Sequence, residues 1–307
     1  MTSVIKVEDL TRSFGRKDVL KGINLEVAPG IVYGLVGENG VGKTTLIQHL
    51  LGLLKAQRGS VRIFGFNPVT HPVDVLGRIG YLSENRDLPG FMKIDEFMTY
   101  NAAFYPRWDH QFATELAATF ELNSTDSLAS LSQGQRARVG LLAALAHRPS
   151  LLLLDEPSTG LDPIVRRDIL SAVIRTVADE GRTVLFSSHL LDEVERVADR
   201  VGILASGKIA LDGELEAIKQ DHLKLVIRFA EPVHQCPRID GALTSTGQGR
   251  EWTVFWHGDA NRVASAINAV GAELVEQHIP SLDDIFVART RPTQASNEHT
   301  EGEETVI

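Results

Sequence analysis

The feature that most constrains this chain is a glycine-rich segment between a short apolar run and a stretch of helical character. The apolar run covers 31–36, and the helical stretch continues to Leu54. Glycines let successive backbone N–H groups turn into one concavity, and the following helix adds its positive end. A strand, a phosphate-cradling loop and a helix are therefore expected here. The loop has the pattern GxxxxGK[ST] and consists of Gly37, Glu38, Asn39, Gly40, Val41, Gly42, Lys43 and Thr44.

Short β-rich runs alternate with segments of helical period from Val4 to about Asp212. This alternation is typical of an α/β fold with a largely parallel sheet covered by helices. No strand signal appears between Leu88 and Leu131, so we expect helices inserted into the α/β body. The predicted strands cover 23–27, 31–36, 60–64, 151–155, 183–187 and 200–204.

The inserted segment is unusually aromatic. Two interpretations are open: the rings form the core of a small helical subdomain at about 88–147, or they form a surface that docks a partner. The aromatic residues are Phe91, Phe97, Tyr100, Phe104, Tyr105, Trp108 and Phe112.

The character of the chain changes after residue 220. Two runs, 223–230 and 251–257, resemble strands, and Asp259 resembles the N-cap of a helix carrying Val263, Ile267 and Val270. We therefore predict a main domain at 1–220 and a small α+β domain at 221–290. The polar residues 291–307 are expected to be a disordered tail.

Composition excludes several kinds of partner. The chain has 307 residues with 31 Lys plus Arg against 40 Asp plus Glu, a formal net charge of −9, so broad attachment to nucleic acid is not expected. No apolar stretch reaches the roughly 18 to 20 residues that span a bilayer, and no secretory signal is visible. The single cysteine, Cys236, fits a reducing compartment such as the cytoplasm.

A second chemical motif is the apolar strand 151–155 that ends in two adjacent carboxylates, Asp155 and Glu156. Asp155 can hold Mg²⁺ through water, and Glu156 can orient or deprotonate a water that attacks a phosphate. Such a pair is by itself more often the exposed start of a loop. The phosphate loop upstream favours the catalytic interpretation.

The segment Leu-Ser-Gln-Gly-Gln at 131–135, between the phosphate loop and the acidic strand, resembles the signature of ATP-binding cassette (ABC) ATPases. The resemblance covers about residues 1–215 and implies a P-loop NTPase fold. The remaining motifs follow in the family's order: Phe14 where an aromatic ring stacks on adenine, 158–162 as the D-loop, and His189 as the switch histidine. Gln133 stands where Gly is frequent in the signature.

The resemblance implies an ATP and Mg²⁺ site that is shared between two cassettes. Glu156, His189 and Lys43 are the expected catalytic residues, and Thr44, Asp155 and Glu84 the expected metal ligands. Glu84 stands where the family often has Gln. The signature of one cassette closes over the ATP of another, so a second copy of this chain or another cassette is required. The expected nucleotide contacts are Phe14, residues 37–44 as named above, Thr45, Ser132, Gly134 and Gln135.

The family comparison also implies a task. Residues 54–64, the stretch from Ser83 and 281–286 resemble single-cassette subunits of ABC-2 type exporters for drugs or antimicrobial peptides. We therefore expect an ATPase at the cytoplasmic face of the membrane that powers transport, in the export direction, through a separate transmembrane permease. The alternatives are a soluble ABC ATPase acting on nucleic acid or ribosomes and a regulatory cassette. The short interval from Lys43 to Ser132, without heptads, disfavours the former.

Overall fold

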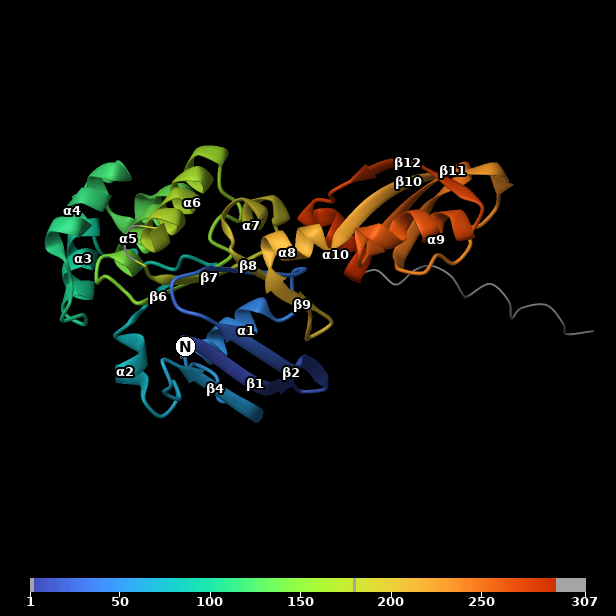
Figure 1. Ribbon diagram of the computed structural model, residues 1–307. Helices are drawn as coiled ribbons and strands as arrows, with labels where there is room; N and C mark the ends of the chain where they lie inside the picture. Colours follow the sequence, from blue (N-terminus) through green and yellow to red (C-terminus); the bar gives the residue numbers. More distant parts are fainter. Residues whose placement is uncertain (1–2, 179–180, 291–307) are drawn as a thin grey trace, which may run out of the picture. The chain divides into compact units, whose positions relative to one another are not determined.

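The computed structural model describes residues 3–178 and 181–290, and the chain divides into two units after Leu215 (Figure 1). The first unit contains the glycine loop, the signature segment 131–135, the acidic strand and His189, and the second unit begins at Glu216. The predicted tail at 291–307 lies outside the described residues.

A six-stranded sheet forms the centre of the first unit, in the order β5-β6-β7-β3-β8-β9. Its first five strands run parallel, and β9 pairs antiparallel with β8. Strands β3 and β6 are buried along their whole length because the sheet is covered on both faces. The strands are β3 (Val32–Val36), β5 (Ile79–Leu82), β6 (Leu151–Asp155), β7 (Thr183–Ser188), β8 (Arg200–Ala205) and β9 (Lys208–Glu214).

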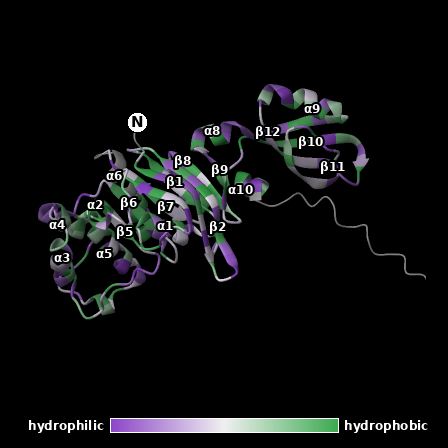
Figure 2. Cartoon of the chain, turned by 90° about the horizontal axis from the view of Figure 1, so that it is seen from below, coloured by the Kyte–Doolittle hydropathy of each residue, from purple (hydrophilic) through white to green (hydrophobic). Residues whose placement is uncertain are grey.

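A second sheet in this unit is antiparallel, with the order β2-β1-β4, and the sequence did not predict it. It consists of β1 (Ile5–Phe14), β2 (Lys17–Val27) and β4 (Arg58–Ile63). Alternate residues of β1 and β2 are buried and exposed, as expected for a sheet with one face toward the core. The strand prediction at 23–27 therefore found only the end of a longer strand. Hydrophobic residues follow the strands around β1, β6 and β8 in Figure 2.

Helices cover the sheets, and the segment from Leu88 to Leu131 contains helices and no named strand. Ile94, Leu128 and Leu131 of this inserted segment form a small core with Val139 of the helix that follows it. Helix α5 begins with a capping box, in which Ser132 and Gln135 exchange hydrogen bonds. The helices of the first unit are α1 (Lys43–Leu50), α2 (Pro72–Leu76), α3 (Ile94–Ala102), α4 (His110–Thr119), η1 (Leu128–Ser130), α5 (Gln133–Leu145), α6 (Pro163–Ala178) and α7 (Leu191–Val197).

The second unit is a three-stranded antiparallel sheet, in the order β11-β10-β12, with short helices. Trp252, Val254 and Trp256 point into its core, as their alternation predicts. Asp259 caps the short helix η2 rather than the longer helix that follows, and β12 and α10 were not predicted. Helix α8 (Leu215–Gln220) begins at the last residue of the first unit. The further elements of the second unit are β10 (His222–Val233), β11 (Ala242–His257), η2 (Ala260–Arg262), α9 (Val263–Ala269), β12 (Ala272–His278) and α10 (Leu282–Thr290).

The architecture therefore agrees with the predicted α/β fold with inserted helices and a small α+β unit. Within the described residues, no helix combines the length and the apolar character needed to cross a membrane.

Candidate active site

The glycine loop follows β3 and leads directly into α1, as the sequence predicts. Gly40 and Gly42 have positive φ angles of 77° and 120°, and a Cβ at Gly42 would lie 2.9 Å from Leu20 Cδ2. A Cβ at Gly37 would lie 2.6 Å from the carbonyl oxygen of Leu204, so both positions require glycine. Helix α1 has no side-chain cap at its N-terminus. No side chain therefore accepts from its first N–H groups, and an anion in the loop can do so.

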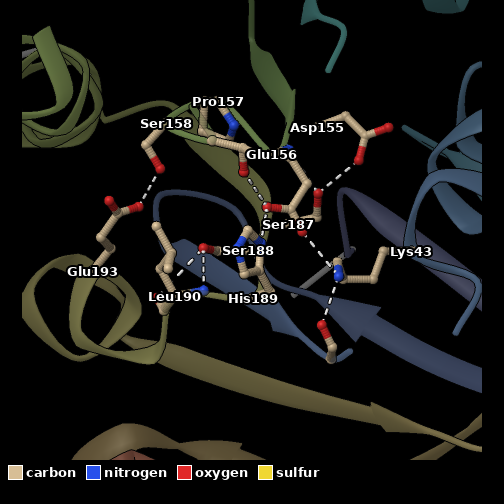
Figure 3. A network of polar contacts seen from close by, with 12 residues as sticks. Lys43, Asp155, Glu156, Pro157, Ser158, Ser187, Ser188, His189, Leu190 and Glu193 are labelled. Atoms are coloured by element: carbon tan, nitrogen blue, oxygen red, sulfur yellow. Dashed lines mark hydrogen bonds and ion pairs between the residues drawn. The ribbon is translucent and has the colours of Figure 1, made fainter. Parts of the chain in front are cut away.

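The ammonium group of Lys43 connects this loop with the acidic strand (Figure 3). Lys43 Nζ donates to the carbonyl oxygens of Gly37 at 2.6 Å and Glu38 at 3.2 Å. It also lies 2.9 Å from Glu156 Oε1, and both side chains of this ion pair are buried. Residues 38–40 are exposed beside it. The structure thus brings together the two motifs that the sequence separates by more than a hundred residues.

Glu156 is the centre of the polar network. Its Oε2 accepts a hydrogen bond from Thr159 Oγ1 at 2.8 Å and lies 2.7 Å from His189 Nδ1. Burial by itself raises the pKa of Glu156, but the hydrogen bond and charge of Lys43, with smaller effects from Thr159 and His189, bring the pKa below its ordinary value. Glu156 is therefore held as a carboxylate, the form that can accept a proton.

Among the described residues, one carboxylate oxygen of Asp155 is hydrogen-bonded and the other is not. Its Oδ1 accepts from Ser187 Oγ at 2.7 Å, whereas its buried Oδ2 has no hydrogen-bond partner within the described part of the chain. Burial raises the pKa of Asp155, and the nearby hydroxyls of Ser187 and Thr44 oppose this shift. A buried carboxylate oxygen without a partner, close to a hydroxyl, suits a hard divalent cation.

Arg86 is a site residue that the sequence analysis missed. Its Nη2 donates to the carbonyl oxygens of Glu156 at 3.4 Å, Pro157 at 3.1 Å and Thr159 at 2.8 Å. Arg86 is buried and lies two residues after Glu84, in the loop that follows β5. It therefore holds the backbone on which Glu156 and Thr159 stand. No spacing rule in the sequence distinguishes it from the other arginines.

Ser187 was also missed as a site residue. Besides its bond to Asp155, its hydroxyl oxygen accepts a hydrogen bond from the backbone N–H of Glu156 at 2.9 Å. That backbone has a positive φ of 46° at Glu156, which is uncommon for a residue with a side chain. The position of Ser187 at the end of the predicted strand 183–187 was the available signal. By these two hydrogen bonds Ser187 holds both the side chain of Asp155 and the backbone of Glu156.

The side chains of Phe14 and Glu84 are exposed, and no hydrogen bond or ion pair of the described residues joins them to this network. The ring of Phe14 is 46% exposed, and the Arg12 guanidinium lies 4.6 Å from its centroid. Glu84 is exposed, and no contact in the described residues joins it to Asp155 or Thr44. The negative charge of Glu84 nevertheless acts on Tyr81 of β5, on which the charge of Asp155 acts as well. Burial and then the charges of Asp155 and Glu84 raise the pKa of Tyr81 to about 12.

The signature residues stand apart from the Lys43–Glu156 network. The Ser132 hydroxyl accepts from the backbone N–H of Gln135 at 3.2 Å, and Gln135 Oε1 accepts from the Ser132 N–H at 3.0 Å. At Gly134 a Cβ would lie 2.9 Å from Val165 Cγ2, so a larger residue would press on α6. None of the hydrogen bonds in the described residues joins these three residues to the glycine loop.

Comparisons with known proteins identify relatives of this chain. Residues 20–159 match the family model described as ABC transporter. The ABC transporter ATP-binding protein YdbJ of Bacillus subtilis is 32% identical over 289 residues, which cover 93% of this chain and 88% of the relative. The bacitracin transport ATP-binding protein BcrA of Bacillus licheniformis is 37% identical over 229 residues, or 73% of this chain and 72% of the relative.

A solved structure of an ATP-binding subunit of an ABC transporter superposes with a TM-score of 0.67 at 28% identity, covering 71% of this chain and 92% of that one. The fold and the site thus define a P-loop ATPase of the cassette type. The chain belongs to the family of ABC transporter ATP-binding proteins. It is the subunit that binds nucleotide and hydrolyses ATP to power transport across a membrane.

Proposed function

We propose that this chain hydrolyses Mg²⁺-bound ATP between the glycine loop and Glu156 and thereby drives an exporter. The observation that carries this proposal is the network of Lys43, Glu156 and His189, in which Lys43 and Glu156 are buried. It lies where β3, β6 and β7 end side by side, and the carboxyl ends of parallel strands share one edge of a sheet.

Lys43 binds the β and γ phosphates in this proposal. Its ammonium now bridges two loop carbonyls and Glu156, so phosphate oxygens have to compete with these acceptors for it. That competition frees Glu156 Oε1 to accept a proton from the attacking water. His189 stays at Oε2 and keeps the carboxylate oriented.

Asp155 and Thr44 are the residues that would hold Mg²⁺, with Glu84 as a further oxygen donor. The buried Oδ2 of Asp155, which has no hydrogen-bond partner in the described chain, is the structural feature that fits a cation. When bound, Mg²⁺ neutralises charge on the transferred phosphate. Thr45 follows in the first turn of α1, where its backbone N–H faces the phosphate end of the helix.

The remaining nucleotide contacts require two cassettes. The exposed face of Phe14 stacks on adenine of the ATP bound by its own chain. Ser132, Gly134 and Gln135 serve the ATP bound by the partner, since the N-terminus of α5 offers N–H groups to an anion. A related solved cassette, from a protein 24% identical to this chain, is dimeric. A second copy of this chain is the simplest partner.

A separate membrane permease completes the transporter, and it places the chain at the cytoplasmic face of the membrane. Phe91, Tyr100 and Phe104 of the helical insertion are exposed, which supports a docking surface there, whereas Phe97 packs against the small core of the insertion. Relatives named for bacitracin transport and daunorubicin resistance support export of an antimicrobial or drug-like compound. The membrane subunit selects that compound.

The test is the variant Glu156→Gln, which keeps the shape of the side chain and removes its proton-accepting charge. We expect ATP hydrolysis to fall by about 10²–10⁴-fold, the range for a lost general base, with ATP binding retained. The exposed Glu214→Gln variant is the matched control. Glu156→Gln should also form an ATP-dependent dimer. Unchanged hydrolysis would refute the role of Glu156, and a monomer with bound ATP would refute the shared site.

A further inference from the structure

A buried carboxylate close to the proposed catalytic pair has no part in the mechanism above. Glu193 lies in the first turn of α7, four residues after His189, and its side chain is buried. Its Oε2 accepts a hydrogen bond from Ser158 Oγ, and Ser158 stands two residues after Glu156 (Figure 3). This bond therefore joins the segment that follows Glu156 to the segment that follows His189.

Ser158 belongs to the tight turn that holds Glu156. The Thr159 N–H donates to the carbonyl oxygen of Glu156 at 3.3 Å, and the Thr159 hydroxyl donates to Glu156 Oε2 at 2.8 Å. The Leu161 N–H donates to the carbonyl oxygen of Ser158 at 3.2 Å. Because these bonds form one connected network, the position of Ser158 is coupled to that of Glu156.

Glu193 is held to the segment of His189 by a second set of short-range bonds. The Leu190 N–H donates to Ser188 Oγ at 2.9 Å, so the backbone on both sides of His189 is fixed before α7 begins. The Glu193 N–H then donates to the carbonyl oxygen of Leu190 at 3.3 Å. A displacement of Glu193 therefore also displaces the backbone that carries His189.

A third element, α6, meets the same carboxylate. Glu193 Oε1 lies 3.0 Å from Arg166 Nε, but it accepts no hydrogen bond within the described part of the chain. Burial raises the pKa of Glu193, and the bond from Ser158 and the charge of Arg166 oppose this shift. The charges of Asp192 and Glu156 raise it further. Replacing a buried ion pair by apolar side chains is often neutral or stabilising, so packing alone does not account for a carboxylate here.

We propose that Glu193 is a positioning residue for ATP hydrolysis, which fixes Glu156 and His189 relative to each other through its bond to Ser158. This inference rests on the proposed role of Glu156 as the proton acceptor. The two segments meet twice, once where His189 contacts Glu156 and once at the Ser158–Glu193 bond, so loss of the second contact loosens the first. A displacement of about 1 Å at a catalytic group lowers a rate by as much as about 100-fold.

The experiment measures kcat and KM for ATP, together with the melting temperature, in the full chain and in Glu193→Ala, Ser158→Ala and their double variant. We expect each single variant to lower kcat by about tenfold or more and to change KM by about twofold or less. The reason is that a misplaced catalytic pair slows the chemical step without weakening nucleotide binding. The double variant should lose about as much as the larger single loss, since two residues that act through one bond are not additive.

Two further variants separate positioning from stability. Glu193→Gln keeps an oxygen that accepts from Ser158, so it should restore part of kcat although it lacks the negative charge. Asp212→Asn is the matched control, because Asp212 also accepts from a hydroxyl, that of Tyr33 at 3.1 Å, and pairs with Arg200 at 3.3 Å. This control should keep kcat within about twofold of the unmodified chain.

The proposal is overturned if Glu193→Ala melts at a lower temperature but keeps its kcat, because Glu193 then serves stability alone. It is also overturned if the two single losses multiply in the double variant, or if KM rises while kcat stays unchanged. Should Glu193→Ala fail to fold, Ser158→Ala decides, since it leaves the Arg166–Glu193 pair in place. An unchanged kcat in Ser158→Ala then refutes the proposal, and a lower kcat with unchanged KM supports it.

Failure of the proposed function gives a different result. In that case Glu156→Gln leaves ATP hydrolysis unchanged. If Glu156→Gln abolishes hydrolysis while Glu193→Ala and Ser158→Ala keep their kcat, only the positioning role of Glu193 is refuted.

Discussion

The two units of this chain bury very different groups. Among the described residues, the buried charged side chains Lys43, Arg86, Asp155, Glu156 and Glu193 all belong to the first unit. In the second unit the described buried side chains are apolar except for His222, and ion pairs such as Arg228–Glu251 and Arg262–Asp240 are exposed. Burying a charge is unfavourable unless it is paired and hydrogen-bonded. The first unit therefore buries the charged groups of the candidate active site, whereas the second unit is stabilised mainly by the packing of apolar side chains.

The largest effect should come from breaking the packing of the second unit. Trp256 is buried there, and its ring lies directly against Gly241. Trp256→Ala should destabilise that unit by about 3–5 kcal/mol, as measured by hydrogen exchange of its amides. Hydrolysis of ATP should change little. Val275→Ala, at a 40% exposed position of the same sheet, is the control. A fall in ATP hydrolysis in parallel with the stability of the second unit would show that the active site depends on the packing of that unit.

Removing the support of the acidic strand should have the next largest effect. Arg86→Ala removes the one donor that the carbonyl groups of Glu156, Pro157 and Thr159 share, and this loss should lower the stability of the first unit by about 1–3 kcal/mol. We expect a drop in kcat for ATP of about tenfold or more, with a smaller change in KM, because Glu156 loses its fixed position. Arg86→Lys, which retains one donor group, should restore part of kcat. A variant that loses stability but keeps kcat would show a purely structural role.

The adenine contact is exposed and should matter less. Phe14→Leu keeps an apolar side chain but removes the ring, so nucleotide affinity should fall by about 1 kcal/mol, the lower end of the range for loss of base stacking. Phe14→Tyr should bind nucleotide as the unmodified chain does. Fluorescence titration with a labelled ATP analogue measures both. Equal affinities in all three proteins would remove Phe14 from the site.

The smallest predicted effect is a pH dependence of the second unit. Nδ1 of His222 lies 2.6 Å from the carbonyl oxygen of Ile218, and Arg289 Nε donates to Nε2, so the ring fits its neutral form. Burial lowers the pKa of His222, the Ile218 carbonyl opposes this shift, and the charge of Arg289 adds to it. The unfolded chain therefore binds the proton more strongly, and stability declines as pH falls below about 6.5.

We expect the second unit to lose about 1 kcal/mol or less between pH 7.5 and 5.5 through His222, as measured by hydrogen exchange. His222→Gln should flatten this profile. The exposed His234→Gln variant should leave it unchanged. An identical slope in all three proteins would show that another group titrates.

The local motifs were predictable, and the residues that support them were not. The predicted strands that carry chemistry, 31–36, 151–155 and 183–187, correspond closely to β3, β6 and β7 because a fully apolar run next to a polar motif is a strong local signal. Strands β1, β5, β9 and β12 escaped prediction, since short or alternating runs depend on which face the tertiary structure buries. Arg86 acts through contacts with distant residues and carries no local signature, and Ser187 was marked only by its position at the end of a predicted strand.

By itself the sequence determined the glycine loop and the start of α1, because positive φ angles and a free helix N-terminus depend on neighbouring residues. The tertiary structure alone decided that Lys43, Glu156 and His189 meet, since the strand order β6-β7-β3 brings the ends of three distant strands together. It also placed the Glu193 carboxylate against Ser158 and Arg166. Charges from distant parts of a chain become a site when the packing of strands places them within a few ångströms of one another.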